Sequence, residues 1–250
     1  MKVKKTNHTF FIGLPKEISL QENRISLTPD AVALLVRQGH DVWVEAKAGV
    51  GSKFDDKQYS EAGAKIVYSQ QEVYQADIIL KIEPPTLDEM QYFKPGQTLI
   101  CALQLGHLEK NFIDSLLQKR ITALAWEFIE DKVGGMPIIR GMSEIAGSTV
   151  MLIAAEYLSS VHDGKGIILG GITGVPPTKV VIIGSGTAAE YAARAALSLG
   201  AEIQVFDNHL YKLRRIKHTL GHQFYTSTID TATLGESLKS TDVVDRKSVV

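Results

Sequence analysis

Three polar residues in the first half of the chain have side chains suited to binding and converting a small carboxylic acid. Arg24 carries a planar guanidinium that can bind a carboxylate through two parallel hydrogen bonds. Lys81 lies within the apolar run 78–82, where a cation must either face a polar cleft or lose its hydration. His107 follows another apolar run and can give or take a proton near neutral pH. Taken alone, each also fits a structural role, as a surface arginine, an edge-strand lysine or a structural histidine.

An alternation of strands and helices is predicted to position these three residues. Short apolar runs of β-forming residues alternate with helical patterns, which favours a parallel sheet with crossover helices. In such a sheet, ligands bind beyond the carboxyl ends of the strands. Arg24, Lys81 and His107 all lie at predicted strand ends, so their joint placement favours a substrate site. The predicted strands are residues 10–14, 41–45, 65–67, 77–82, 98–103 and 121–125.

The first helix has clear boundaries in the sequence. Thr28 can cap its amino end, Pro29 suits its first position and Asp30 favours the positive end of its dipole. Gly39 can end it. The helix is therefore predicted to begin at Pro29 and to stop before Gly39.

A second α/β unit is predicted to begin near residue 140. An apolar-rich helix over residues 142–158, with Ser143 as its cap, is expected to bridge the two units. After a pair of prolines comes a nearly all-apolar strand, residues 179–183, of the kind that is buried on both faces of a parallel sheet. We therefore expect a substrate domain over residues 1–139 and a nucleotide-binding domain over residues 140–250.

The segment after this strand has the form of a dinucleotide-binding turn. Gly184 permits the tight turn, and Gly186 lets the backbone approach a pyrophosphate. Ala189 stands where the fingerprint has its third glycine. This replacement is tolerated because a methyl group still allows close packing of helix and strand. Thr187 and Ala188 begin the next helix, whose unpaired N–H groups and positive dipole end would face the phosphates.

Asp207 stands at the end of the next predicted strand, 207 − 186 = 21 residues after Gly186. A carboxylate there accepts hydrogen bonds from the adenosine ribose and repels a 2′-phosphate, which favours NAD over NADP. Asp207 could instead be an ordinary turn residue. Lys212 is also assigned to the cofactor site, although Lys212, Arg214 and Arg215 would together form a solvated helix face.

The overall composition limits the possible partners. Charged residues make up 22% of the chain and the formal net charge is −1, so electrostatics give no support for a nucleic-acid or membrane-surface partner. No run approaches the roughly 18 uninterrupted apolar residues of a membrane span, and residues 1–9 are polar, so we expect a cytoplasmic protein. The single cysteine, Cys101, excludes an internal disulfide and is expected to be a small buried strand residue. No cluster of metal ligands is visible.

Several short motifs, in the same order along the chain, resemble those of the alanine dehydrogenases. This family shares its fold with the nucleotide-binding subunit of proton-translocating NAD(P) transhydrogenase, and the resemblance runs over residues 10–244. The motifs are GLPKE at 13–17, ENRISLTP at 22–29, LKIEP at 80–84, LGHL at 105–108, MSEIAG at 142–147 and GGITGVPP at 170–177.

The resemblance implies the reversible, NAD-dependent oxidative deamination of L-alanine to pyruvate and ammonium. In the family pattern Arg24 and Lys81 hold the substrate, His107 is the acid/base, and Ser143 contacts the cofactor, although Ser143 could equally be a simple helix cap. His107 favours the dehydrogenase over the transhydrogenase subunit, which has no amino-acid substrate that needs this base. A non-catalytic NAD-binding protein is a third interpretation. The family also suggests a homo-oligomer, in the form of a hexamer.

Two features depart from the family pattern. Ser148 stands where the family usually has an arginine. After Val244, residues 245–250 bear no resemblance to the family, and the strands that would complete the nucleotide sheet do not follow. We therefore expect a truncated α/β chain with two Rossmann-like parallel-sheet domains, the second incomplete, and little or no activity for this polypeptide.

Overall fold

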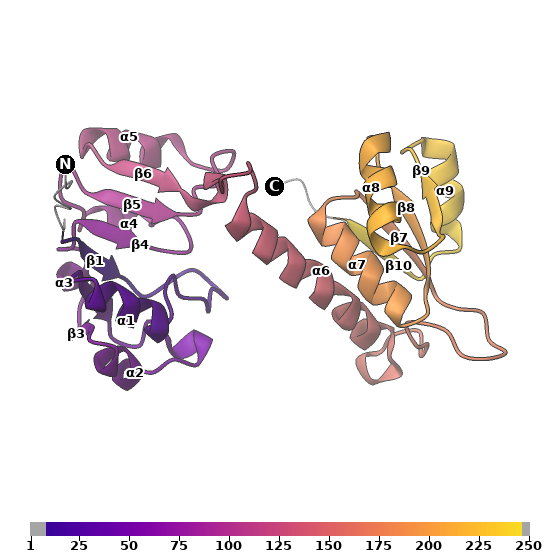
Figure 1. Ribbon diagram of the computed structural model, residues 1–250, viewed down its shortest axis with the longest axis horizontal. Helices are drawn as coiled ribbons and strands as arrows, with labels where there is room; N and C mark the ends of the chain where they lie inside the picture. Colours follow the sequence, from indigo (N-terminus) through magenta and orange to yellow (C-terminus); the bar gives the residue numbers. More distant parts are fainter. Residues whose placement is uncertain (1–8, 247–250) are drawn as a thin grey trace, which may run out of the picture. The chain divides into compact units, whose positions relative to one another are not determined.

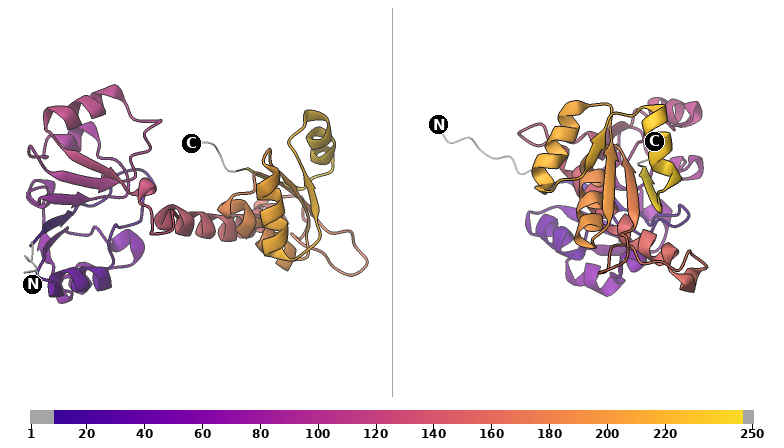
Figure 2. Two further views of the ribbon diagram at one scale, coloured as in Figure 1. Left: turned by 45° about the horizontal axis from the view of Figure 1, so that its top comes forward. Right: turned by 90° about the vertical axis from the view of Figure 1, so that its right-hand side faces the viewer.

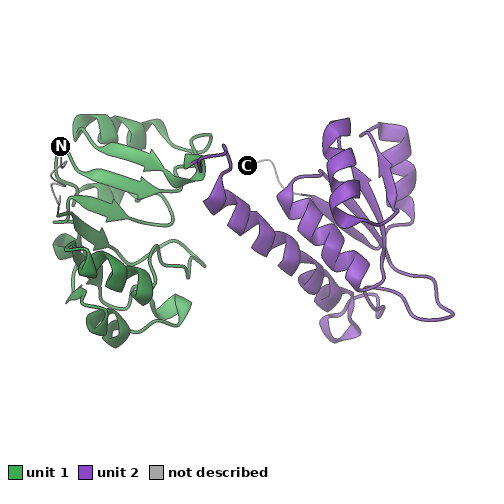
Figure 3. Ribbon diagram, viewed as in Figure 1, with its two compact units in different colours: residues 1–129 green, residues 130–250 purple. Residues whose placement is uncertain are grey.

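The computed structural model describes residues 9–246 of the chain. The chain divides into two compact units, Met1–Ile129 and Glu130–Val250 (Figure 3). This division precedes the long helix α6 (Pro137–Leu158), whereas the predicted division between residues 139 and 140 falls inside that helix.

Unit 1 is built on a six-stranded parallel sheet with the strand order β3-β2-β1-β4-β5-β6 (Figure 1). All six predicted strands are confirmed. The order reverses between β1 and β4, and this is the point at which open α/β sheets form a crevice outside the carboxyl ends of their strands. The strands are β1 (Phe11–Leu14), β2 (Asp41–Glu45), β3 (Lys65–Val67), β4 (Ile78–Leu80), β5 (Thr98–Cys101) and β6 (Thr122–Ala125).

Short helices connect these strands, and the first begins where the sequence predicts. The Thr28 hydroxyl accepts a hydrogen bond from the Ala31 N–H, and Gly39 follows the helix with a φ of 90°, a left-handed conformation that glycine adopts without strain. Cys101 is buried in β5, as predicted. The helices are α1 (Pro29–Arg37), α2 (Asp56–Glu61), α3 (Gln70–Val73), α4 (Leu87–Met90) and α5 (Lys110–Gln118), with 3-10 turns η1 (Val50–Ser52) and η2 (Trp126–Phe128).

Unit 2 contains a four-stranded parallel sheet with the order β10-β7-β8-β9, which corresponds to the first four strands, in the order 3-2-1-4, of a doubly wound sheet. The sheet lies between α8 on one face and α9 on the other (Figure 2). β7 is the predicted apolar strand and is almost fully buried. The elements are α6, η3 (Ser160–His162), β7 (Lys179–Ile183), α7 (Thr187–Ser198), β8 (Glu202–Phe206), α8 (Leu210–Leu220), β9 (Tyr225–Ser227), α9 (Thr231–Lys239) and β10 (Val243–Arg246).

The start of α6 differs from the prediction. The helix begins at Pro137, not at Met142, and its cap residue Met136 makes no side-chain capping bond. Proline is favoured in the first turn because its ring presets φ and its missing N–H needs no partner there. Ser143 is therefore an interior residue of the helix, and the prediction that it caps the helix is wrong.

α6 is also notable for its apolar character. Among residues 9–246 it is the one helix whose length and composition would allow it to cross a membrane. The helix also carries the charged residues Arg140, Glu144 and Glu156. α6 packs along α7 within unit 2 (Figure 1).

The contact between α6 and α7 depends on a glycine. Gly147 is buried, and a Cβ added to it would lie far inside van der Waals contact of the Ala188 carbonyl oxygen and 2.8 Å from the Tyr191 Cβ. Gly147 therefore allows the two backbones to approach each other at the beginning of α7, beside the glycine-rich turn.

We expect Gly147→Ala to destabilise unit 2 by about 1–3 kcal/mol, because the methyl group forces the two helices apart. Gly141→Ala, in the same helix, is the matched control: a Cβ there meets nothing within 4 Å. It should instead stabilise the helix by about 0.5–1 kcal/mol, because alanine loses less conformational freedom on folding than glycine does. Thermal unfolding followed by far-UV circular dichroism measures both changes, and shifts of the same sign would contradict this account.

Candidate functional site

Lys81 is buried directly after β4, with 2% of its surface exposed. Its ammonium Nζ lies 2.9 Å from Glu89 Oε1 and 3.1 Å from Glu17 Oε2. The Tyr74 hydroxyl donates a second hydrogen bond of 2.9 Å to Glu89 Oε1. The structure therefore resolves the problem of a cation in an apolar run by pairing it with two carboxylates, neither of which the sequence analysis identified.

Local structure explains why Glu89 is available to Lys81. Thr86 and Glu89 form the capping box of α4: the Thr86 N–H donates to Glu89 Oε2 at 2.8 Å, and the Glu89 N–H donates to Thr86 Oγ1. One carboxylate oxygen thus holds the helix, while the other receives Lys81 and Tyr74. The spacing Thr-x-x-Glu is a sequence signature of such a box and would have identified this residue.

Glu17 connects the loop after β1 to the end of β4. Its Oε1 accepts a hydrogen bond of 2.6 Å from the Ile82 N–H, whereas its Oε2 approaches the Lys81 ammonium without the geometry of a hydrogen bond. Glu45, at the end of β2, adds another carboxyl group nearby, and burial raises its pKa even though the Lys16 N–H and the charge of Lys81 oppose that effect. The Lys81 ammonium is therefore buried among carboxyl groups.

Arg24 lies in the loop after β1 and is bound by a neighbouring carboxylate. Its Nε donates to Glu22 Oε1 at 2.8 Å and its Nη2 to Glu22 Oε2, so the guanidinium makes the two-pronged contact expected of it. The hydrogen bonds from Arg24 lower the pKa of Glu22. Arg24 Nη2 also lies 3.7 Å from Glu83 Oε1, which links this loop to the segment after Lys81.

His107 lies in the turn that follows β5, and its side chain is exposed. Its N–H donates to the Gln104 carbonyl oxygen at 2.8 Å, and among residues 9–246 its imidazole has no hydrogen-bond partner. Because β1, β4 and β5 are neighbours in the sheet, Arg24, Lys81 and His107 follow three adjacent strand ends. The structure links Arg24 to the segment after Lys81 through Glu83, whereas no described contact joins His107 to either residue, and the His107 ring is exposed.

The glycine-rich turn of unit 2 has the geometry of a phosphate-binding loop. Gly184 has a φ of 109°, which favours glycine, and its N–H donates to the Phe206 carbonyl oxygen at 2.7 Å. Gly186 precedes α7, and no side chain caps this helix. A Cβ added at Gly184 or Gly186 would meet nothing within 4 Å, so the space beside both glycines is open. The first N–H groups of α7, including those of Thr187 and Ala188, have no partner within the helix.

Asp207 is buried at the end of β8 and binds the turn. Its Oδ2 accepts hydrogen bonds of 2.8 Å from both the N–H and the hydroxyl of Ser185, and its Oδ1 accepts from the N–H and ring Nδ1 of His209. Burial opposes ionisation, but these hydrogen bonds outweigh it and lower the pKa of Asp207 to about 2. Asp207 is therefore an anion at neutral pH.

Two residues around this turn were not recognised from the sequence. Ser185 is fully buried and holds the turn to Asp207. Arg215, which the sequence suggested lies on a solvated helix face, instead donates from its guanidinium to the Ser185 carbonyl oxygen at 2.8 Å. The one sequence signal for this contact is the position of Arg215 in the first two turns of α8. Any exposed residue of a helix can have such a position, so the signal does not single out Arg215.

Ser143, in α6, and Lys212, in α8, are the other two residues that the sequence assigned to the cofactor site. Ser143 is one helical turn before Gly147, on the side of α6 that packs on α7. Lys212 lies in the first turn of α8, with its Nζ 6.0 Å from the centre of the Tyr211 ring. Among the residues that the structure describes, neither side chain is hydrogen-bonded to the glycine-rich turn or to Asp207, so their assignment to a cofactor site stays a prediction.

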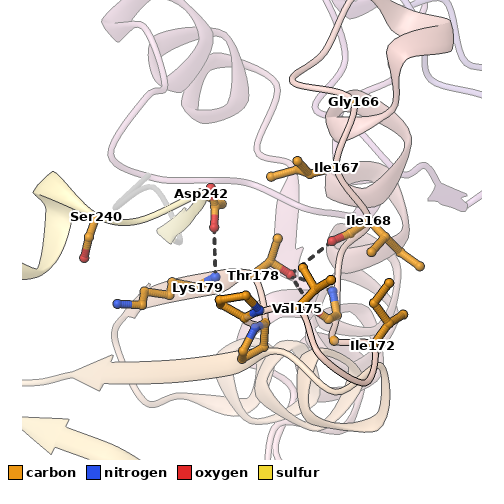
Figure 4. Close-up of a pocket in the computed structure, with 13 residues that line it drawn as sticks. Gly166, Ile167, Ile168, Ile172, Val175, Thr178, Lys179, Ser240 and Asp242 are labelled. Atoms are coloured by element: carbon orange, nitrogen blue, oxygen red, sulfur yellow. Dashed lines mark hydrogen bonds between the residues drawn. The ribbon is translucent and has the colours of Figure 1, made fainter.

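A cavity of about 510 Å³ lies elsewhere in unit 2 (Figure 4). It is lined by residues 166–179 together with Ser240 and Asp242, and the Asp242 carboxylate accepts a hydrogen bond of 3.0 Å from the Lys179 N–H. Lys179 is the first residue of β7, so this cavity is at the amino end of the strand. Since ligands of open α/β sheets bind outside the carboxyl ends of the strands, the cavity is not the candidate nucleotide site. Within residues 9–246 no group of three or more His, Cys, Asp or Glu side chains could hold a metal ion.

Comparison with known proteins points to one family. Residues 13–146 match the family model "Alanine dehydrogenase/PNT, N-terminal domain", and residues 150–244 match "Alanine dehydrogenase/PNT, C-terminal domain". The chain is 40% identical over 233 residues to an alanine dehydrogenase of Staphylococcus saprophyticus, and 38% identical to alanine dehydrogenase 2 of Staphylococcus aureus. In both cases the match covers 93% of this chain and 62% of the relative, so the chain spans less than two thirds of their length.

Solved structures show the same relationship. The structure of an L-alanine dehydrogenase superposes with a TM-score of 0.85 at 33% identity, covering 93% of this chain and 64% of that one. A transhydrogenase from Sinorhizobium meliloti superposes with a TM-score of 0.81 at 24% identity, covering 96% of this chain and 70% of that one, which shows a shared fold. The two matched domains and the relatives' sequences establish that this chain belongs to the alanine dehydrogenase/PNT family.

Proposed function

We propose that this chain carries the substrate- and nucleotide-binding parts of an enzyme that oxidises L-alanine to pyruvate and ammonium with NAD. The observation that carries this proposal is the open glycine-rich turn at the start of α7, held by the ionised Asp207 at the end of β8, in a chain of this family. An anion at that place suits a ribose diol and repels a 2′-phosphate, which is why we propose NAD in place of NADP.

The residues of unit 2 fit a dinucleotide. The backbone N–H groups after Gly184 and Gly186, including those of Thr187 and Ala188, would bind the pyrophosphate. Asp207 would accept hydrogen bonds from the adenosine ribose. When bound, the nicotinamide ring supplies a hydride acceptor. Ser143, one turn before the close contact at Gly147, is proposed to face the same cofactor, and Lys212 is proposed to lie near its adenosine end.

The residues of unit 1 supply the groups that the amino acid needs. Arg24 would bind the substrate carboxylate through two hydrogen bonds from its guanidinium. The substrate carboxylate would then either displace Glu22 from the guanidinium or bind beside it. Lys81 would place its ammonium beside the oxygen that forms at the α-carbon. Loss of the hydride from the α-carbon of the neutral amine would leave an iminium ion. His107 would accept a proton from the water that adds to the iminium carbon and give it to the nitrogen of the resulting carbinolamine. Ammonia would then leave as the C–N bond breaks, and the hydroxyl proton would pass to His107 as the carbonyl forms.

The proposal is tested with the purified chain by two measurements. Fluorescence titration with NADH measures cofactor binding, and absorbance at the NADH band after mixing the chain with NAD and L-alanine at alkaline pH measures turnover. NADH binding with alanine-dependent reduction would support the proposal in full. Absence of NADH binding would overturn it.

NADH binding without alanine-dependent reduction would favour a second candidate, a non-catalytic nucleotide-binding protein. One observation supports that candidate: Arg24 and Lys81 are already paired with carboxylates of the chain itself. A transhydrogenase subunit is less favoured, because the likeness to the transhydrogenase structure shows only the fold and His107 has no use there. A cytoplasmic location, a homo-oligomer in the form of a hexamer, and the absence of nucleic-acid and membrane partners are further parts of the proposal.

If the unchanged chain turns over L-alanine measurably, we expect His107→Gln to reduce that turnover by about 100-fold or more, because general acid–base catalysis contributes factors of that size. NADH binding should not change, since His107 belongs to unit 1 and the nucleotide turn to unit 2. His40→Gln is the control, because His40 accepts a hydrogen bond from the Phe10 N–H, at the amino end of β1 and away from the strand ends that carry the site. Equal turnover of the His107 variant and the unchanged chain would remove this histidine from the mechanism.

A further inference from the structure

The Asp207 carboxylate already receives four hydrogen bonds. Two come from Ser185, through its N–H and its hydroxyl, and two come from His209, through its N–H at 2.8 Å and its ring Nδ1 at 3.0 Å. An ionised carboxylate has about four lone-pair positions. The anion proposed to receive a ribose diol is therefore fully occupied by the protein, and at least one of the four donors must leave before a ribose hydroxyl can bind to it.

The four donors differ in how readily they can leave. The two N–H groups belong to the backbone of the turn and of the segment that enters α8, so they move only with those segments. The Ser185 hydroxyl is fully buried, and its N–H and carbonyl oxygen are held by Asp207 and Arg215. The His209 side chain is 56% exposed. Its imidazole is therefore the donor that can rotate into solvent at the smallest cost.

The other contacts of this ring would not prevent its release. The Tyr211 ring meets it edge-on with the centres 5.7 Å apart, and Tyr211 is itself exposed. Because an ionised carboxylate can only accept, the ring nitrogen that faces Asp207 must carry a hydrogen. That hydrogen occupies a lone-pair position on Oδ1, which becomes available to a ribose hydroxyl once the ring leaves.

We propose that the His209 imidazole is a built-in competitor of the adenosine ribose: it fills the ribose position on Asp207 in the free protein and leaves when the dinucleotide binds. This inference rests on the proposed NAD site and adds to it a residue that sets the affinity. The ring satisfies a buried anion while the site is empty, and the cost of moving it weakens binding of the nucleotide.

Removing the ring should strengthen binding. We expect His209→Ala to bind NADH about 3- to 10-fold more tightly, because one exposed hydrogen bond no longer has to be broken. His218→Ala is the matched control, since His218 is an exposed histidine of α8, the helix that His209 precedes, and has no contact to Asp207 in the described residues. Fluorescence titration of the whole chain with NADH measures all three affinities, and far-UV circular dichroism checks that the variants fold.

A pair of simpler ligands tests whether the ribose diol is the competing group. ADP carries the adenosine diol, whereas 2′,3′-dideoxy-ADP lacks both hydroxyls, and each can be titrated in competition with NADH. The gain from His209→Ala should appear with ADP and vanish with the dideoxy ligand.

Three outcomes would overturn the inference. They are unchanged or weaker NADH binding by His209→Ala, an equal gain with the dideoxy ligand, and an equal gain in His218→Ala. If neither the unchanged chain nor any variant binds NADH, the proposed nucleotide site itself fails and this inference fails with it. Binding by the unchanged chain without a gain in His209→Ala rejects the competitor role alone.

Discussion

Asp207→Asn is expected to weaken NADH binding by about 10- to 100-fold, because hydrogen bonds to a charged group are worth roughly 1.5–3 kcal/mol. The reason lies in the donors that converge on this carboxylate. An amide offers only one acceptor oxygen, so its NH₂ group would point at donors from Ser185 or His209 and leave one of them unpaired. The variant therefore loses both the ribose acceptor and the group that shapes the turn.

The same substitution predicts a change in how stability depends on pH. The Asp207 pKa is lowered from the ordinary value of 3.8 to about 2 by its hydrogen bonds, against the effect of burial. A carboxyl with a lowered pKa in the folded state stabilises the protein fully above about pH 4, and this contribution disappears as the pH falls towards about 2. The Asp207→Asn variant has no carboxyl group at this position, so its stability should not show this decrease at low pH.

Thermal unfolding of unit 2 between pH 7 and pH 2, followed by circular dichroism, measures this effect on stability.

For the NADH affinity, Asp230→Asn provides a comparison, because Asp230 caps α9 through hydrogen bonds to the N–H groups of Ala232 and Thr233 but is exposed and distant in sequence from the turn. It should leave NADH affinity unchanged. Equal NADH affinities of Asp207→Asn and the unchanged chain would remove Asp207 from the nucleotide site.

Lys81→Met is expected to destabilise unit 1 by about 3–5 kcal/mol, the usual cost of removing one partner of a buried ion pair. The side chains of Lys81 and Glu89 are each 1% exposed, and that of Glu17 is 5% exposed. Without the ammonium, two buried carboxylates would remain with only the Tyr74 hydroxyl and backbone N–H groups as donors. The effect is thus larger than the loss of the lysine's own contacts.

Urea unfolding followed by tryptophan fluorescence measures this loss selectively, because both tryptophans of the chain, Trp43 and Trp126, belong to unit 1. A second substitution, Glu89→Gln, should recover part of the stability lost in Lys81→Met, because it removes one of the unpaired charges. Lys57→Met is the matched control: Lys57 pairs with Glu61 at the surface, and its loss should change stability by less than about 0.5 kcal/mol. A loss of under about 1 kcal/mol in Lys81→Met would show that this ion pair is not important for folding.

The secondary structure of this protein could be predicted mostly from its sequence. The six strands of unit 1, the start of α1 at Pro29, the apolar strand β7 and the glycine-rich turn all appear in the structure as predicted. Each depends on side chains within a few residues of one another, whose alternation, capping or backbone freedom acts locally. The start of α6 was missed because the sequence contains two possible starts, and Pro137 extends the helix beyond Ser143.

The partners of the candidate site residues were decided by the tertiary structure alone. Glu17 reaches the Ile82 N–H across 65 residues of sequence, and Arg215 reaches the Ser185 carbonyl oxygen across 30. The sequence by itself determined that a cation at position 81 and a carboxylate at position 207 would stand at strand ends. Only the folded chain determined that the first is paired with two glutamates and the second with Ser185 and His209, because such contacts depend on which distant segments the sheet order brings together.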